Sequence, residues 1–161
     1  MNTVKLMAVG DIFLKTRNNK YPFERVQKLF KNRDVLFSNL ETVISTKSKK
    51  KDKAFPLCIS SEKVKYLKEV DFDVLNLANN HIMDLGIEGF NETLDVLTKN
   101  NLQFIGVGNN KYILNYIIIE KRGIKLGFLG YLKDGTKYPI PLWQIEQATK
   151  ISFAVDQEIK K

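Results

Sequence analysis

The chain has 161 residues, of which 43% are hydrophobic and 27% are charged, and this composition is typical of a folded domain. The 26 lysine and arginine residues against 18 aspartate and glutamate residues give a net charge of +8. The single cysteine, Cys58, excludes a disulfide-stabilised scaffold. No apolar run approaches the ~20 residues that a membrane-spanning helix needs. We therefore expect one cytoplasmic domain over residues 1–161, with no membrane span.

Short apolar runs alternate with amphipathic segments along the first two thirds of the chain. The apolar runs predict buried strands, and apolar side chains at helical spacing predict helices between them. The predicted strands cover residues 3–9, 34–40, 73–78 and 102–107, and the predicted helices cover residues 21–31, 62–70 and 86–100. Strands separated by helices indicate an α/β fold around a mainly parallel sheet.

The pattern changes after residue 107. Two apolar segments, 115–120 and 124–131, flank the turn sequence Lys121-Arg122-Gly123 and predict a β-hairpin. From Asp134 onward the sequence predicts no definite element.

The positive charge is concentrated near the N-terminus. Residues 1–60 hold 13 basic and 5 acidic side chains, whereas the remainder holds 13 of each. Much of the excess lies in the lysine-rich segment 47–53, KSKKKDK. Such a segment is typical of a solvated loop, or it guides a polyanion such as a phosphorylated or polyglutamate ligand toward the protein. It lacks the interleaved aromatic residues that stack on bases, so no nucleic acid is expected as a partner.

Polar side chains follow three of the predicted strands at the point where each strand ends. Asp11 follows the first strand, Glu41 the second, and Asn79–His81 the third, with Asp84 close behind. The carboxyl ends of parallel strands meet at one edge of a sheet, where α/β proteins bind their ligands. We therefore expect these side chains to converge on one site.

This donor set predicts metal chemistry. Carboxylate and amide oxygens with one imidazole suit Mg²⁺, Mn²⁺ or Fe, and such an ion acidifies a bound water. His81 is the only histidine, which excludes a zinc site built mainly from imidazoles. His81 could instead protonate a leaving group while Asp84 holds its other ring nitrogen. The alternative for each residue is structural: strand-end caps for Asp11 and Glu41, a turn for the asparagines, and a hydrogen-bonded histidine.

Five segments in this order resemble the bacterial capsule-synthesis CapA family, also called the PgsA-like poly-γ-glutamate synthesis family. They are AVGDIFL, FSNLETVIS, DFDVLNLANNHIMDLGIEGFNETLDVL, FIGVGNN and GIKLGFLGYL, and the resemblance covers nearly all of residues 3–132. This family is related to the calcineurin-like metallophosphoesterases. The resemblance implies a four-layer α/β/β/α sandwich with a divalent metal (Mn, Mg, Fe or Zn) bound by Asp11, Glu41 and Asn80. It also implies that His81 helps to protonate the leaving group.

The sequence departs from the family pattern after His81. The family carries further histidines in a His-Trp-Gly motif and a later Gly-His-x-x-His-type motif, and neither motif is present here. The resemblance therefore implies that the chain corresponds to the N-terminal part of such a domain, cut before its second half. We expect apolar surface on strand 73–78 and on the hairpin to lack a cover, which favours self-association or a complementing chain.

One leading functional hypothesis and its alternatives follow. The first is a CapA-like protein of capsule or poly-γ-glutamate biosynthesis with a partial, metal-dependent phosphoesterase-type site acting on an anionic polymer or a phosphorylated substrate. The second is a non-catalytic α/β module that binds a polyanion or a partner protein, or an inactive remnant of the enzyme.

Overall fold

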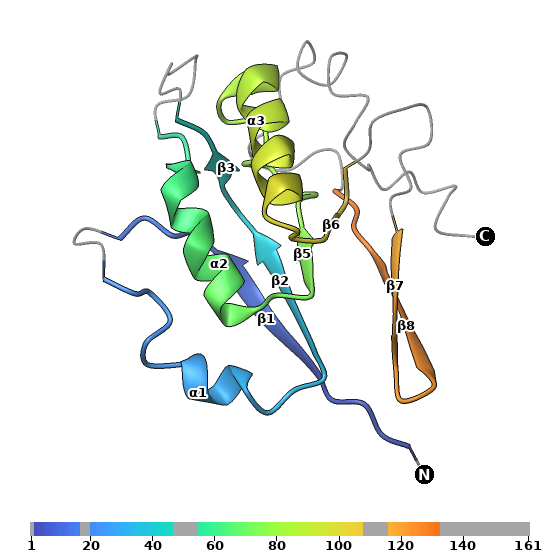
Figure 1. The fold of residues 1–161 in the computed structure, drawn as a ribbon. Coiled ribbons are helices and arrows are strands. Elements are labelled where there is room, and N and C mark those ends of the chain that lie inside the picture. Colours follow the sequence, from blue (N-terminus) through green and yellow to red (C-terminus); the bar gives the residue numbers. More distant parts are fainter. Residues whose placement is uncertain (1, 17–19, 47–54, 108–115, 133–161) are drawn as a thin grey trace.

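A four-stranded parallel sheet forms the centre of the computed structural model, which describes residues 2–16, 20–46, 55–107 and 116–132. The strands lie in the order β1-β2-β5-β6, and each neighbouring pair is parallel (Figure 1). Their bounds are Leu6–Ile12 for β1, Val35–Leu40 for β2, Val74–Asn76 for β5 and Phe104–Ile105 for β6. The predicted α/β class is confirmed, and all four carboxyl ends lie at one edge of the sheet.

The helices cover one face of this sheet (Figure 1). They are α1 (Gln27–Phe30), the 3-10 turn η1 (Ser61–Lys63) that leads into α2 (Val64–Val70), and α3 (Gly86–Lys99). Leu36 of β2 and Leu75 of β5 belong to the same buried cluster as Leu67 of α2 and Phe90 of α3. Burial of these large apolar side chains is the main force that joins the helices to the sheet.

A β-hairpin packs on the opposite face of the sheet. It consists of β7 (Tyr116–Lys121) and β8 (Ile124–Leu129), joined by Arg122 and Gly123 with φ values of 54° and 78°. A two-residue turn with both φ values positive matches the right-handed twist of the strands. The ring of Phe37 stacks on that of Phe128 at 5.9 Å between centroids. Because neighbouring residues of a strand point to opposite faces, Phe37 places the hairpin opposite the helices that contact Leu36.

A small parallel ribbon, which the sequence analysis did not predict, links two loops. Its strands are β3 (Val43–Ile44) and β4 (Cys58–Ile59). Thr93 of α3 fixes the ribbon, since its hydroxyl accepts a hydrogen bond from the Ile44 backbone N–H at 2.9 Å. The ribbon thereby brings the segment after residue 54 toward the carboxyl edge of the sheet.

Several predicted boundaries were wrong. The first strand starts at Leu6 instead of residue 3 and runs through Gly10 and Asp11 to Ile12. The helix expected over residues 21–31 shrinks to Gln27–Phe30, because Tyr21 packs on Tyr66 and Phe23 packs on Phe72 instead of forming a helical stripe. The predicted strand 102–107 retains only Phe104–Ile105. The segment from Asp134 lies outside the described residues.

Exposed apolar side chains lie on the hairpin and not on the predicted strand 73–78. Val74 and Leu75 are fully buried, so the expected exposure of strand 73–78 was wrong. On the outer face of the hairpin, Tyr116, Ile118 and Leu129 are 61%, 58% and 56% exposed. The described residues form three layers (helices, sheet and hairpin), and self-association through the exposed face remains a prediction. Within the same residues, no helix has the length and apolar character to cross a membrane.

Candidate metal and acid–base site

The carboxyl ends of β1 and β2 bring two carboxyl groups together. Asp11 lies opposite Asn39 in the β1–β2 register, and the Glu41 backbone N–H donates to the Ile12 carbonyl at 3.0 Å. This hydrogen bond extends the pairing of the two strands beyond their last residues. Glu41 is therefore held beside the end of β1, and its carboxyl group is hydrogen-bonded to that of Asp11.

The Glu41 carboxyl group is perturbed by its surroundings. Burial raises its pKa above the ordinary value, and the charge of Asp11 and the hydrogen bond between the two carboxyl groups raise it further. The charge of His81 partly offsets these effects. Two carboxyl groups in contact disfavour double ionisation unless a cation lies beside them.

His81 lies in the turn between β5 and α3 and contacts both sides of the site. Its Nδ1 is 2.8 Å from Asp84 Oδ2, and its Nε2 is 3.9 Å from Glu41 Oε1. The side chain is 19% exposed, so its ring is held by the protein while an edge stays reachable from solvent. His81 thus connects the carboxylate pair to Asp84.

Asp84 is the most deeply buried member of this group, with a side chain that is 1% exposed. Its Oδ2 also accepts a hydrogen bond from the Leu57 backbone N–H at 2.7 Å, just before β4. Because Asp84 accepts from Leu57 and faces His81 Nδ1, the hydrogen of the ring belongs on Nδ1. Asp84 therefore orients the imidazole and ties the β3–β4 ribbon to the site.

The structure brings four of the five predicted site residues into one series of contacts: Asp11, Glu41, His81 and Asp84. Asn80 is half-buried in the same turn, and its side chain makes no hydrogen bond to the described residues. The oxygen donors fit a hard divalent ion. However, no three His, Cys, Asp or Glu side chains in the described ranges gather as a ready metal shell. The Asp11–Glu41 pair fits part of such a shell, which further donors or water would complete.

Three asparagines connect the strand ends; the sequence analysis placed Asn79 after the third strand but did not predict the hydrogen bonds that join the three. Asn39 donates to Asp11 Oδ1 at 2.7 Å and accepts from Asn76 and Asn79 at 3.0 and 3.3 Å. Asn79 also accepts from the His81 backbone N–H at 3.1 Å. Buried polar side chains need hydrogen-bond partners. The asparagines inside the apolar strings FSNLE and VLNLANN were therefore the sequence signal that could have predicted such a cluster.

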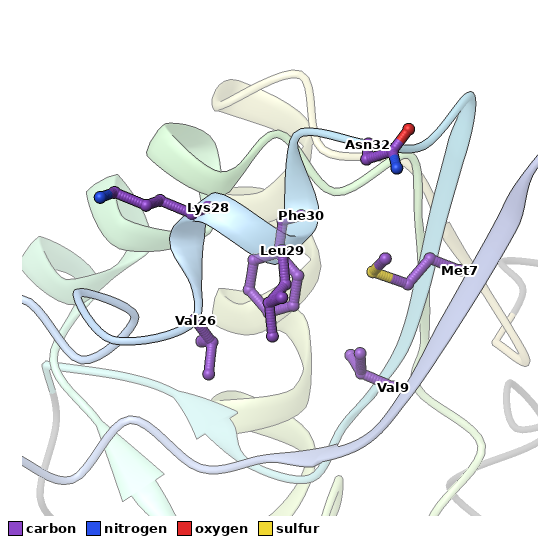
Figure 2. A pocket seen from close by; sticks show the side chains of 7 residues that line it. All are labelled: Met7, Val9, Val26, Lys28, Leu29, Phe30 and Asn32. Carbon is purple, nitrogen blue, oxygen red and sulfur yellow. The ribbon is translucent and has the colours of Figure 1, made fainter.

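A separate pocket of about 750 Å³ opens between β1 and α1 (Figure 2). Its lining consists of Met7, Val9, Val26, Lys28, Leu29, Phe30 and Asn32. None of the predicted site residues lines it, and its walls are mainly apolar. The lysine-rich segment 47–53 lies outside the described residues.

Sequence comparisons agree with the resemblance found in the strand-end motifs. The family model described as "Bacterial capsule synthesis protein PGA_cap" matches residues 5–159. "Capsule biosynthesis protein CapA" of Bacillus anthracis is 34% identical over 116 residues, which cover 69% of this chain and 28% of the relative. "PGA biosynthesis protein CapA" of Bacillus subtilis (strain 168) is 39% identical over 88 residues, which cover 53% of this chain and 23% of the relative.

The alignments span only about a quarter of the length of these curated relatives. They do not extend to the remainder of the relatives. The family match, by contrast, covers nearly the whole of this chain, including the strand ends that carry Asp11, Glu41 and His81. The chain therefore belongs to the bacterial capsule synthesis protein family PGA_cap, as the resemblance to CapA predicted.

Proposed function

We propose that this chain carries part of a divalent-metal-dependent phosphoesterase-type site that serves the biosynthesis of an anionic capsule polymer such as poly-γ-glutamate. One observation carries the proposal: Asp11, Glu41, His81 and Asp84 form a continuous series of contacts at the carboxyl ends of parallel strands. The link to the polymer comes from the names of the two CapA relatives.

Asp11 and Glu41, together with the Asn80 amide, are the residues that would hold the ion. A divalent ion held there would supply charge neutralisation and would acidify a water for attack on a phosphoester. The two carboxyl groups repel an anionic substrate when they are ionised and unneutralised. Binding of a phosphoester or a polyglutamate chain next to them therefore depends on the cation.

His81 is placed to move a proton. Asp84 fixes the hydrogen on Nδ1, so Nε2 is the ring atom that exchanges a proton with the substrate. Nε2 faces Glu41 at 3.9 Å, which orients it toward the carboxylate pair and not toward the core. The chain thus supplies both an anionic cation-binding pair and, beside it, an imidazole nitrogen that can exchange a proton.

Metal binding provides the first test. We expect calorimetry to show one Mn²⁺ site of micromolar or weaker affinity, because only part of the shell comes from these residues. Asp11→Asn and Asn80→Ala should each weaken binding at least about tenfold, by analogy with the loss of metal-site partners. Asp95→Asn is the matched control, since Asp95 is an exposed carboxylate on α3 away from the strand ends.

Two outcomes would contradict the proposal. One is a folded wild-type chain that binds no divalent ion, and the other is an Asp11→Asn variant that binds Mn²⁺ as tightly as the wild type does. The second assay is hydrolysis of bis(p-nitrophenyl) phosphate with Mn²⁺ and with EDTA, using His81→Ala as the inactive reference. Binding of poly-γ-glutamate in EDTA, unchanged by Asp11→Asn and without hydrolysis, would favour the non-catalytic binding module instead.

A further inference from the structure

Asn39 lies at the centre of the hydrogen bonds that join the strand ends. It is the residue of β2 opposite Asp11, and it is half-buried. Its Nδ2 donates to Asp11 Oδ1 at 2.7 Å, and its Oδ1 accepts from Asn76 and Asn79. One side chain therefore touches residues from β1, β5 and the turn that carries His81.

The orientation of the Asn39 amide is determined by its neighbours. Asn76 Oδ1 accepts from the Ala78 N–H at 3.2 Å, and Asn79 Oδ1 accepts from the His81 N–H at 3.1 Å. Both asparagines must therefore turn their NH₂ groups toward Asn39. The Asn39 oxygen faces these two donors, which leaves its own NH₂ group for Asp11. Because this oxygen already accepts two hydrogen bonds, Asn39 is not itself a metal ligand.

The surrounding chain is shaped to enclose this cluster. A Cβ atom on Gly106, which has φ of +85°, would lie 2.8 Å from Asn76 Oδ1. A Cβ atom on Gly130 would collide with the same oxygen. The backbone at both positions lies so close to the Asn76 amide that only glycine fits there. This close packing leaves the amide little freedom to turn away from Asn39.

We propose that Asn39 is a positioning residue that holds the Asp11 carboxylate in its cation-binding orientation and, through Asn79, links it to the backbone of His81. This inference rests on the proposed function, because it assumes that Asp11 binds the ion. Without Asn39, the Asp11 carboxylate at the exposed end of β1 loses the donor that fixes its rotation. Metal ligands that lose such a partner typically bind about 10- to 100-fold more weakly.

The test is a double-mutant cycle on Mn²⁺ affinity, measured by calorimetry on the full chain. The variants are Asn39→Ala, Asp11→Asn and the double variant, with urea unfolding recorded for each. Asn39→Thr is the second variant, since a β-branched residue suits a strand but cannot reach Asp11. Asn100→Ala is the control, because it removes another hydrogen-bonded asparagine, at the end of α3.

We expect Asn39→Ala and Asn39→Thr to weaken Mn²⁺ binding about tenfold or more. The same substitution should have no further effect when Asp11 is already Asn, since Asn39 acts through Asp11. Asn100→Ala should lower stability and leave the affinity unchanged. A crystal structure of Asn39→Ala should show a rotated Asp11 carboxylate.

Three results would overturn the inference. Mn²⁺ affinity of the Asn39 variants within twofold of wild type would mean that Asn39 only stabilises the fold. An equal loss of affinity in the Asp11→Asn background would mean that Asn39 acts by another route. Absence of Mn²⁺ binding by the folded wild-type chain would overturn the proposed function, and this inference with it.

Discussion

The central sheet and the β7–β8 hairpin are built in different ways. Strands β2 and β5 place Leu36, Leu40 and Leu75 in a fully buried core beneath the helices. In the hairpin no residue of either strand is buried, because one face is half-buried on the sheet and the other is open. Among the described residues, the contacts that hold the hairpin include Phe37 on Phe128 and Arg122 to Asp34.

This difference explains where the candidate site lies. Polar side chains keep fixed positions only where the backbone that carries them is rigid. The strand ends with Asp11, Glu41 and the asparagines belong to the packed sheet. We infer that the stability of the site depends mainly on the sheet and its helices, and that the hairpin region acts on it chiefly through Gly130, which adjoins Asn76.

The largest contrast is expected between buried and exposed apolar side chains. Leu75→Ala should lower the free energy of unfolding by about 3 kcal/mol, because it leaves a cavity in a well-packed core. Ile118→Ala, on the open face of the hairpin, should change it by less than about 0.5 kcal/mol. Urea denaturation measures both values. Similar losses for the two variants would show that the hairpin is part of one uniform core.

The second-largest loss of stability is expected when buried hydrogen bonds are removed. Asp84→Ala removes the acceptor of the Leu57 N–H and of His81 Nδ1, and should cost about 2 kcal/mol of stability. Glu120→Ala, an exposed acid on β7, is the control and should have little effect. Thermal or urea unfolding can compare them, and a neutral Asp84→Ala would mean that its buried hydrogen bonds contribute nothing.

The contact between the hairpin and the sheet can be weakened separately. Phe128→Ala removes the stacked pair with Phe37, and should cost about 1 kcal/mol. Hydrogen exchange should then accelerate at the amides of β7 and β8 while those of β2 and β5 stay protected. Equal acceleration in the sheet would contradict the independence of the two regions.

The smallest expected effect on stability is that of Glu41→Gln, which should stabilise the chain instead of destabilising it. The pKa of Glu41 is raised in the folded chain, so the folded state keeps a proton that the unfolded state has released. The stability associated with this proton is fully present below the ordinary glutamate pKa and is lost as pH rises through the raised value. Glu41→Gln avoids that loss.

The measurement is urea unfolding of both proteins in EDTA across the acidic to neutral range. We expect the advantage of Glu41→Gln to grow as pH rises and to reverse when Mn²⁺ is added, because only the wild type retains the carboxylate. A constant difference at all pH values would show that Glu41 is not perturbed by Asp11 and burial.

The parallel sheet, the hairpin turn and the strand-end position of Asp11, Glu41 and His81 could be predicted from local sequence patterns. Helix 86–100 was predicted almost to the residue, since its apolar spacing is regular. The extent of the helix over residues 21–31 was not predicted correctly, because the contact of Phe23 with Phe72 determines the conformation of that segment. The asparagines Asn39, Asn76 and Asn79 stand out within apolar strings, but their mutual contacts join distant segments and are not contained in any local pattern. The same is true of the β3–β4 ribbon.

The most direct test of the site uses the fact that His81 is the only histidine of the chain. Its ring protons give signals in the NMR spectrum that belong to no other residue, and bound Mn²⁺ broadens signals of nearby nuclei. Substoichiometric Mn²⁺ should broaden the His81 ring signals and the amides of Asp11 and Glu41, and leave the amide of Gly123 at the hairpin turn sharp. Broadening confined to other regions, with the His81 signals unchanged, would contradict a metal site at the strand ends.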